Sequence, residues 1–254
     1  MWRCPWERMS SSVTELTPGF KVFYRTSTKF GRHPIVSVDS FLTIKSILRS
    51  FSSDEVVCIC DNATNSQNRF FLERFSCAYI TKLGNCGSFR LAVKLAMAGL
   101  HPASIYYFVE DDHLHLPDQK KFLIEGLKHF DFVSLYDHPD KYFDPAYKQL
   151  RRRIVWTPMG HFAESPSTVM TFGCSAETLK RASPILLEEC FTGSDLKIPL
   201  DHAMFIALSE AGFSLGTALP GRSTHCERNL LSPGVDWCAY ANALASDCAI
   251  SMNP

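Results

Sequence analysis

The sequence predicts an α/β fold in which helices cover both faces of a mostly parallel central sheet, and three observations lead to this prediction. Apolar, strand-like segments alternate with helical segments four times in the first half of the chain. Residues 56–60 are continuously apolar, which is typical of a strand buried on both faces. Residues 105–109 are equally apolar and run straight into Glu110, Asp111 and Asp112. Alternation of this kind indicates right-handed βαβ units in one sheet.

The first half of the chain supplies the predicted parallel strands. Apolar residues in continuous runs or in alternation indicate strands, and a spacing of three and four indicates helices. The predicted strands are residues 20–25, 56–60, 77–80 and 105–109. The predicted helices are residues 38–51, 70–75 and 89–98.

The second half is less regular. Its predicted strands are residues 131–136, 154–156, 168–172 and 213–219. Its predicted helices are residues 176–181 and 199–208, the second with Asp201 in its first turn, and residues 137–150 form a polar loop or a short helix. A carboxylate in the first turn of a helix is favourably placed against the helix dipole.

Composition argues against a nucleic-acid-binding protein and against a membrane-spanning protein. Lys and Arg together number 26, as do Asp and Glu, and this zero net charge argues against a protein that mainly grips nucleic acid. No stretch is apolar over the eighteen or so residues that a membrane span needs, and the first residues lack the apolar core of a signal peptide. The ten cysteines form no Cys-x-x-Cys pair, which disfavours a zinc knuckle and favours reduced thiols. We therefore expect a cytoplasmic protein without a membrane span.

Polar residues gather where the predicted parallel strands end. Arg25, Asp61 and the triplet from Glu110 to Asp112 each follow a strand, and residues 84–88 form the turn into a helix. Ligands of open α/β sheets bind at this edge. Unpaired buried carboxylates are unfavourable, and a divalent cation that prefers oxygen ligands is their most effective partner. The triplet therefore predicts a cation site, the alternative being a solvated loop.

The aromatic strand that ends in Glu110, Asp111 and Asp112 resembles the DXD-type metal motif of nucleotide-sugar-dependent glycosyltransferases with the GT-A fold. The resemblance covers roughly residues 20–227 as an order of elements. It implies a Rossmann-like, three-layer sandwich and an enzyme that moves a sugar from a nucleotide-sugar donor, most simply a UDP-sugar, to a hydroxyl of a glycan or similar acceptor. It also implies Mn²⁺ or Mg²⁺ as the cofactor.

The resemblance assigns roles to the residues that match its pattern. Asp112, the last acid of the motif, is the implied metal ligand. Glu110 and Asp111 are then implied to face the ribose and the sugar of the donor, and Asp61 to contact the nucleoside. His225, after the last core strand, is implied to be a further metal ligand, although a lone histidine in a polar loop is also an ordinary surface residue.

The resemblance further implies that Asp201 is the catalytic base of an inverting reaction. Inversion needs a base that takes the proton of the acceptor hydroxyl. An ordinary helix start would also explain this aspartate. Glu164 and Asp195 are alternative bases.

Further side chains are candidates for donor binding. Arg25 could frame the base of the nucleotide, and Asn85 lies in a turn where backbone amides can approach a ligand. Arg90 could reach a phosphate or the ribose, and Arg222 could neutralise the diphosphate. Each is also compatible with a purely structural role.

The domain organisation follows from the same resemblance. Residues 1–18 are polar and irregular and are expected to be a lead-in. Residues 19–254 contain no repeat or low-complexity linker, so we expect one GT-A-like domain. Its nucleotide-binding half is placed at about residues 19–117, its acceptor-binding half at 118–230, and a lid or tail at 231–254, where Trp237 could stack on a sugar.

Other functions share part of this pattern. A sugar-phosphate nucleotidyltransferase would have the same core, but it would be expected to carry a glycine-rich, basic loop after the first strand, and residues 24–31 contain one glycine. A non-catalytic carbohydrate-binding protein would not need the carboxylates. His113 and His115 would suit zinc, but no cysteine or third histidine lies near them in the sequence.

Overall fold

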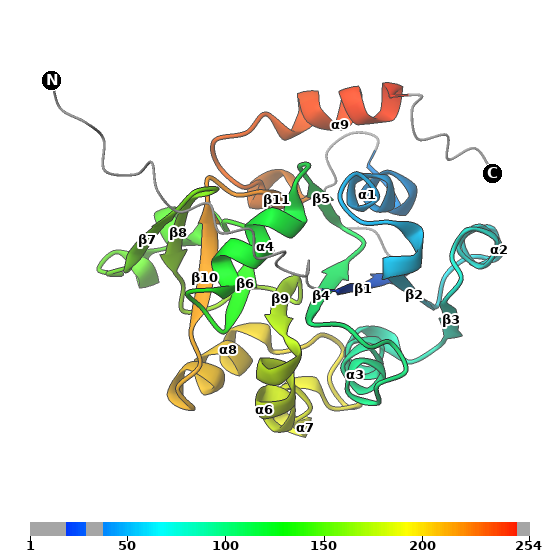
Figure 1. Ribbon diagram of the computed structural model, residues 1–254, viewed down its shortest axis with the longest axis horizontal. Helices are drawn as coiled ribbons and strands as arrows, with labels where there is room; N and C mark the ends of the chain where they lie inside the picture. Colours follow the sequence, from blue (N-terminus) through cyan, green and yellow to red (C-terminus); the bar gives the residue numbers. More distant parts are fainter. Residues whose placement is uncertain (1–18, 29–37, 248–254) are drawn as a thin grey trace, which may run out of the picture.

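The computed structural model describes residues 19–28 and 38–247 (Figure 1). The predicted lead-in at residues 1–18, part of the loop at 24–31 and the end of the predicted tail lie outside the described residues. In the described ranges, no helix combines the length and the apolar character needed to cross a membrane.

A nine-stranded sheet forms the centre of the molecule, in the order β3-β2-β1-β4-β9-β6-β10-β8-β7. The strands are β1 (Phe20–Thr26), β2 (Val56–Asp61), β3 (Ala78–Thr81), β4 (Ile105–Glu110), β6 (Phe132–Ser134), β7 (Ile154–Thr157), β8 (Gly160–Glu164), β9 (Phe172–Ser175) and β10 (Leu215–Leu219). β1 pairs in parallel with β2 and β4, and β2 with β3. Among these strands only β8 and β9 run against the others. The predicted α/β class with a mostly parallel sheet is confirmed.

Helices cover both faces of this sheet (Figure 1). One face carries α1 (Ser40–Ile47), α2 (Asn65–Arg74) and α4 (Gln119–Leu127), and the other carries α3 (Gly84–Met97), α6 (Ala176–Leu186) and α8 (Asp201–Glu210). The side chains of successive strand residues point to opposite faces of the sheet. Tyr107 therefore lies in the buried cluster on the α1 face, and Phe108 lies in the buried cluster on the α3 face. This is the predicted three-layer sandwich.

A third buried cluster lies outside the sandwich, next to α1. It is formed around a two-stranded sheet of β5 (His113–His115) and β11 (Ser223–His225), with α9 (Trp237–Ser246) packed on α1. Trp237 is 1% exposed, and its indole N–H donates to the Ser232 carbonyl at 2.8 Å. The Trp237 ring is therefore part of this core and is not exposed to a sugar in this structure. The predicted lid or tail at residues 231–254 stays a prediction.

The other described elements are short. They are the helices α5 (Asp140–Phe143) and α7 (Glu189–Thr192) and the 3-10 turns η1 (Ser53–Glu55), η2 (Pro145–Tyr147) and η3 (Arg228–Leu230).

The structure differs from the sequence prediction mainly in the second half. β9 begins at Phe172 and not at residue 168. The threonines before it make hydrogen bonds to neighbouring segments through their side chains. The Thr168 hydroxyl donates to Ser134 Oγ at 2.8 Å, and Thr171 Oγ1 accepts from the Glu110 amide at 3.1 Å. The prediction also missed β5, α4, β8, β11 and α9.

Replacing Gly126 of α4 by alanine is expected to destabilise the protein. Helix propensity alone would favour alanine by up to about 1 kcal/mol. The added Cβ, however, would lie 2.7 Å from Val133 Cγ2 and 2.8 Å from Phe162 Cε1. We expect a net loss of about 1–3 kcal/mol in the free energy of unfolding, measured by urea denaturation. The exposed control Lys121→Ala should change it by less than about 0.5 kcal/mol, and a more stable Gly126→Ala protein would contradict this packing.

Candidate functional site

The carboxyl end of β4 meets the end of β1. Glu110 is the last residue of β4 and pairs in register with Arg25. Its Oε1 lies 3.0 Å from Arg25 Nη2. Arg25 is buried, and its Nη1 donates to the Asn85 carbonyl at 3.0 Å, to Asn85 Oδ1 at 2.8 Å and to Ser88 Oγ at 3.2 Å. The predicted donor-binding residues Arg25, Asn85 and Glu110 thus form one contact group at the strand ends.

Asp111 faces the protein. Its Oδ2 accepts hydrogen bonds from the Thr26 hydroxyl at 2.8 Å and from the Ser27 amide at 2.9 Å. Burial first, and then the neighbouring charge of Asp112, raise the pKa of Asp111 to about 7. In this arrangement Asp111 ties the end of β4 to the end of β1. Its predicted contact with the donor stays a prediction.

Asp112 stands between two histidines. β5 begins directly after it and pairs with β11 so that His113 lies opposite His225. Asp112 Oδ2 is 3.1 Å from His225 Nε2, and Asp112 Oδ1 is 3.9 Å from His113 Nε2. One ligand atom from each of the three residues lies within 4.8 Å of the others. Together these three residues form a candidate metal cluster.

The electrostatics of the cluster favour a charged pair. Burial would raise the pKa of Asp112, but the hydrogen bond and charge of His225 outweigh it and lower the pKa to about 2. Burial would likewise lower the pKa of His225, but the hydrogen bond and charge of Asp112 raise it above the usual 6.5. Without a cation, His225 and Asp112 therefore neutralise each other.

Part of the cluster has no partner. His113 is fully buried, and neither of its ring nitrogens makes a hydrogen bond within the described residues, nor does Asp112 Oδ1. Burial lowers the pKa of His113, which keeps its ring neutral. Buried polar atoms are nearly always satisfied. A neutral imidazole and a carboxylate oxygen left without partners fit a divalent cation, so the residues present suit the predicted metal.

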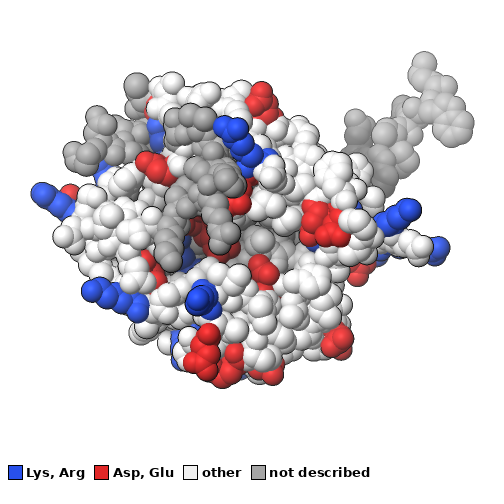
Figure 2. All heavy atoms as spheres, turned by 180° about the vertical axis from the view of Figure 1, so that it is seen from behind, with Lys and Arg blue, Asp and Glu red and all other residues white. Residues whose placement is uncertain are grey.

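The charge of Asp201, at the start of α8, acts on Glu110. Burial raises its pKa, and its Oδ1 accepts a hydrogen bond from the His202 amide at 2.7 Å. Burial also raises the pKa of Glu110 to about 7; the charge of Arg25 opposes this, and the charges of Asp112 and Asp201 add to it. Asp201 is therefore close enough to Glu110 for their charges to interact. Figure 2, a view from behind, shows acidic side chains gathered in a hollow near the centre of that face.

Asp61, at the end of β2, accepts hydrogen bonds from the turn that leads into α3. Its Oδ1 accepts from the Thr81 hydroxyl at 2.8 Å and from the Leu83 amide at 2.6 Å, and its Oδ2 accepts from the Gly84 amide at 2.9 Å and from the Asn62 side chain at 2.8 Å. This carboxylate holds the turn that presents Asn85. Its predicted nucleoside contact stays a prediction.

Arg90 and Arg222 have partners away from the cluster. Arg90 donates to the Leu187 carbonyl at 2.6 Å and to Glu189 Oε1 at 2.7 Å, which ties α3 to α7. Arg222 donates to the Pro117 carbonyl at 2.8 Å and lies over the Phe122 ring at 4.5 Å. Their predicted donor contacts also stay predictions.

The alternative bases lie in more open positions. Glu164 and Asp195 are both exposed, and Glu164 Oε2 is 3.5 Å from Arg153 Nε. Neither of them is among the groups whose charge shifts the pKa of Glu110 most.

Sequence reasoning missed His113 as a partner of Asp112 and His225. The signal was present, because His113 follows the acidic triplet directly. What the sequence did not reveal was the pairing of two three-residue strands, which supplies the second histidine.

Comparison of the sequence with known families and curated proteins gives no match. No family model matches the chain, and no curated protein matches it.

Solved structures share its fold. GalNAc-T7, in a structure with UDP, GalNAc and Mn²⁺, is 11% identical with a TM-score of 0.55, and the match covers 85% of this chain. This chain spans 46% of that protein. A nucleotidyl transferase from Methanothermobacter thermautotroptrophicus is 11% identical with a TM-score of 0.50, over 89% of this chain and 98% of that one. Identities this low establish the fold alone, and the predicted GT-A-like fold is confirmed.

The affinity for Mn²⁺ is expected to depend on pH through His225. The pKa of His225 is raised above 6.5. Its ion pair with Asp112 therefore stabilises the metal-free fold fully below pH 6.5. This stabilisation is lost as the pH rises through the raised pKa of His225. Metal binding needs the neutral ring. Apparent Mn²⁺ affinity measured by calorimetry should therefore rise from about pH 6 to about pH 8.

Two variants check the assignment. His225→Ala should weaken Mn²⁺ binding and flatten its pH dependence, whereas His161→Ala, at an exposed histidine on β8, should change neither. An unchanged pH profile in His225→Ala would contradict the role of this ring.

Proposed function

We propose that this protein is a metal-dependent, inverting glycosyltransferase that uses a nucleotide-sugar donor. The observation that carries the proposal is the candidate metal cluster of Asp112, His113 and His225 at the carboxyl end of β4. In a sheet of this topology, this edge is where ligands bind.

The donor set favours Mn²⁺ over Mg²⁺. Mg²⁺ prefers oxygen ligands and keeps most of its water, whereas two imidazoles and one carboxylate suit a softer divalent ion. When bound, such an ion acts as a Lewis acid that stabilises the charge growing on the departing nucleoside diphosphate. The chain itself contributes the three ligands and, in Arg25, a buried cation beside Glu110.

The donor sugar is assigned to the group around Arg25. Glu110 is partly exposed. Because its pKa is raised to about 7, its carboxyl group can accept a hydrogen bond from a sugar hydroxyl or donate one to it near neutral pH. Asn85 would extend the same surface. A UDP-sugar is the simplest donor, and Asp61, Arg90, Asp111 and Arg222 remain proposed contacts of its nucleotide part.

Asp201 is proposed as the catalytic base. The acceptor oxygen forms a bond to the anomeric carbon while the bond from that carbon to the β-phosphate oxygen breaks. The electron pair leaves with the nucleoside diphosphate, and the acceptor proton passes to the Asp201 carboxylate. Its raised pKa makes this carboxylate a better proton acceptor than an ordinary surface aspartate.

A nucleotidyltransferase is the second candidate, because one solved structure with this fold is a nucleotidyl transferase. The two reactions release different products. A glycosyltransferase releases a nucleoside diphosphate, whereas a nucleotidyltransferase that consumes a nucleoside triphosphate releases pyrophosphate.

Donor turnover tests the proposal. The full chain should release nucleoside diphosphate from at least one member of a panel of UDP-, GDP- and TDP-sugars when Mn²⁺ is present, and not with EDTA. Asp112→Ala should lose both Mn²⁺-dependent nucleotide binding and turnover. Pyrophosphate released from nucleoside triphosphates, without any turnover of nucleotide sugars, would refute glycosyl transfer and favour the second candidate.

The proposed base has a separate test. Asp201→Asn should bind Mn²⁺ and nucleotide like the wild type but lower kcat by about 10²–10⁴-fold, because proton removal is lost. Asp195→Asn, in the loop before α8, should keep its turnover. If turnover survives in Asp201→Asn and fails in Asp195→Asn, the base is assigned to the wrong aspartate.

A further inference from the structure

A row of rings leads away from the candidate metal cluster. The rings of His225 and His113 have centroids 5.3 Å apart, and those of His113 and Tyr136 are 5.1 Å apart. The next ring, His138, lies 5.0 Å from Tyr136. The row forms because the chain beyond β6 makes a bridge to β11 at Tyr136. His138 therefore lies at the same edge of the sheet as the cluster.

His138 is held firmly in place. Its Nδ1 lies 2.9 Å from Asp140 Oδ1 and 3.1 Å from the Asp140 amide nitrogen. Lys141 Nζ in turn donates to both Asp140 carboxylate oxygens, at 2.8 and 2.9 Å. The Lys141 side chain is only 3% exposed, with Nζ 4.3 Å from the centre of the Tyr147 ring. Charges buried this deeply need their partners, so the direction of the His138 ring is built into the fold.

The same contacts continue to the proposed base. Ser167 Oγ lies 3.5 Å from Lys141 Nζ and 3.0 Å from His202 Nδ1. His202 directly follows Asp201 at the start of α8. Burial has the largest effect on the pKa of His113 and on that of Asp201. The charge of His138 also lowers both pKa values. The ring of His138 thus lies near both the cluster and the base.

One nitrogen of His138 remains for a ligand. Nε2 has no hydrogen-bond partner in the described part of the chain, and the side chain is 21% exposed. A hydroxyl suits this nitrogen in either tautomer, because a hydroxyl both donates and accepts. A phosphate oxygen only accepts, so it suits only a protonated Nε2. The position therefore favours a hydroxyl-bearing ligand.

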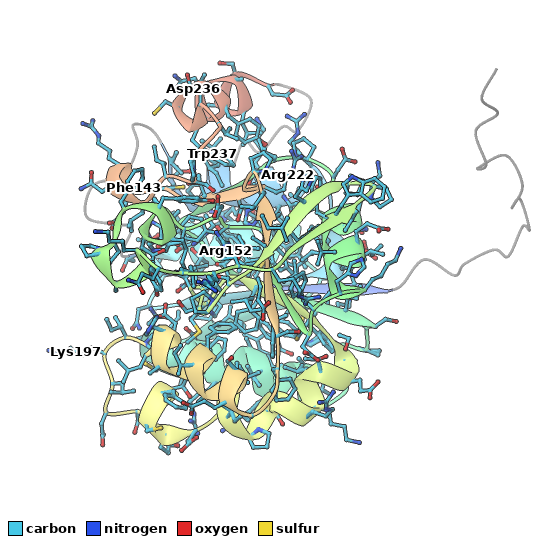
Figure 3. All side chains as sticks on the ribbon, turned by 90° about the vertical axis from the view of Figure 1, so that its left-hand side faces the viewer. Phe143, Arg152, Lys197, Arg222, Asp236 and Trp237 are labelled. Carbon is cyan, nitrogen blue, oxygen red and sulfur yellow. The ribbon has the colours of Figure 1, made fainter. Side chains whose placement is uncertain are left out.

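An exposed aromatic ring follows on the same segment. Phe143, at the end of α5, is 79% exposed. Figure 3 shows Phe143 on the same side of the molecule as Lys197, which lies in the loop before Asp201 and α8. Sugar-binding sites combine such rings, which pack on the C–H face of a pyranose, with a few polar groups that bind its hydroxyls.

We propose that His138 and Phe143 form a saccharide acceptor subsite, in which His138 Nε2 hydrogen-bonds a hydroxyl and the Phe143 ring packs on the sugar. This inference rests on the proposed glycosyltransferase function for the identity of its ligand. Asp140 and Lys141 are positioning residues that orient His138.

Saturation-transfer NMR on the full chain, with Mn²⁺ and UDP present, tests the subsite using a panel of methyl glycosides as probes. At least one glycoside should bind the wild type, and His138→Ala should weaken it by roughly three- to tenfold, the loss expected for one hydrogen bond. His138→Gln should stay within about threefold of the wild type, because its amide can also donate or accept. His161→Ala serves as the matched surface control and should bind like the wild type.

Calorimetry with Mn²⁺ and UDP separates this test from the proposed function. All these variants should bind Mn²⁺ and UDP like the wild type. The subsite is overturned if no glycoside binds, or if His138→Ala binds as well as the wild type. A chain that binds no nucleotide but still binds a glycoside through His138 would refute the proposed reaction and support the sugar subsite.

Discussion

The site depends on one constraint, which is that Asp112 shares a buried space with two imidazoles. The pairing of β5 with β11 imposes this arrangement, and the third buried cluster packs against that pairing through Leu114. The Tyr240 hydroxyl of α9 donates to the His115 carbonyl at 2.6 Å, and the His115 amide donates to Ser46 Oγ of α1 at 3.1 Å. α9 and α1 therefore pack against the strand that carries His113.

Neighbouring residues divide the acidic triplet into three roles. Glu110 pairs with Arg25, Asp111 fastens β4 to β1 through hydrogen bonds, and Asp112 pairs with His225. Of the three, only Asp112 has its pKa lowered, because its hydrogen bond to His225 and the charge of that ring outweigh burial. The charge of His225 also acts on Glu110, but burial dominates there and raises the pKa. Three consecutive acidic residues are thus distinguished by the residues that each side chain contacts.

The first half of the fold could be predicted from the sequence because continuous apolar runs mark its buried strands. The ends of these strands also predicted the group of Arg25, Asn85 and Glu110, since parallel strands present their carboxyl ends at one edge. β5 and β11 could not be predicted, because three residues carry no measurable periodicity. The roles proposed for His113 and His138 depend on that pairing and on the bridge at Tyr136, which only the three-dimensional structure shows.

The proposed glycosyl transfer depends on a cation held by Asp112, His113 and His225. The most direct test is a crystal of the protein grown with Mn²⁺ and UDP, with anomalous diffraction recorded at the manganese edge. We expect one strong peak within about 2.5 Å of a carboxylate oxygen of Asp112 and of a ring nitrogen from each histidine. A peak bound elsewhere, or nucleotide bound with no manganese between these three side chains, would contradict it.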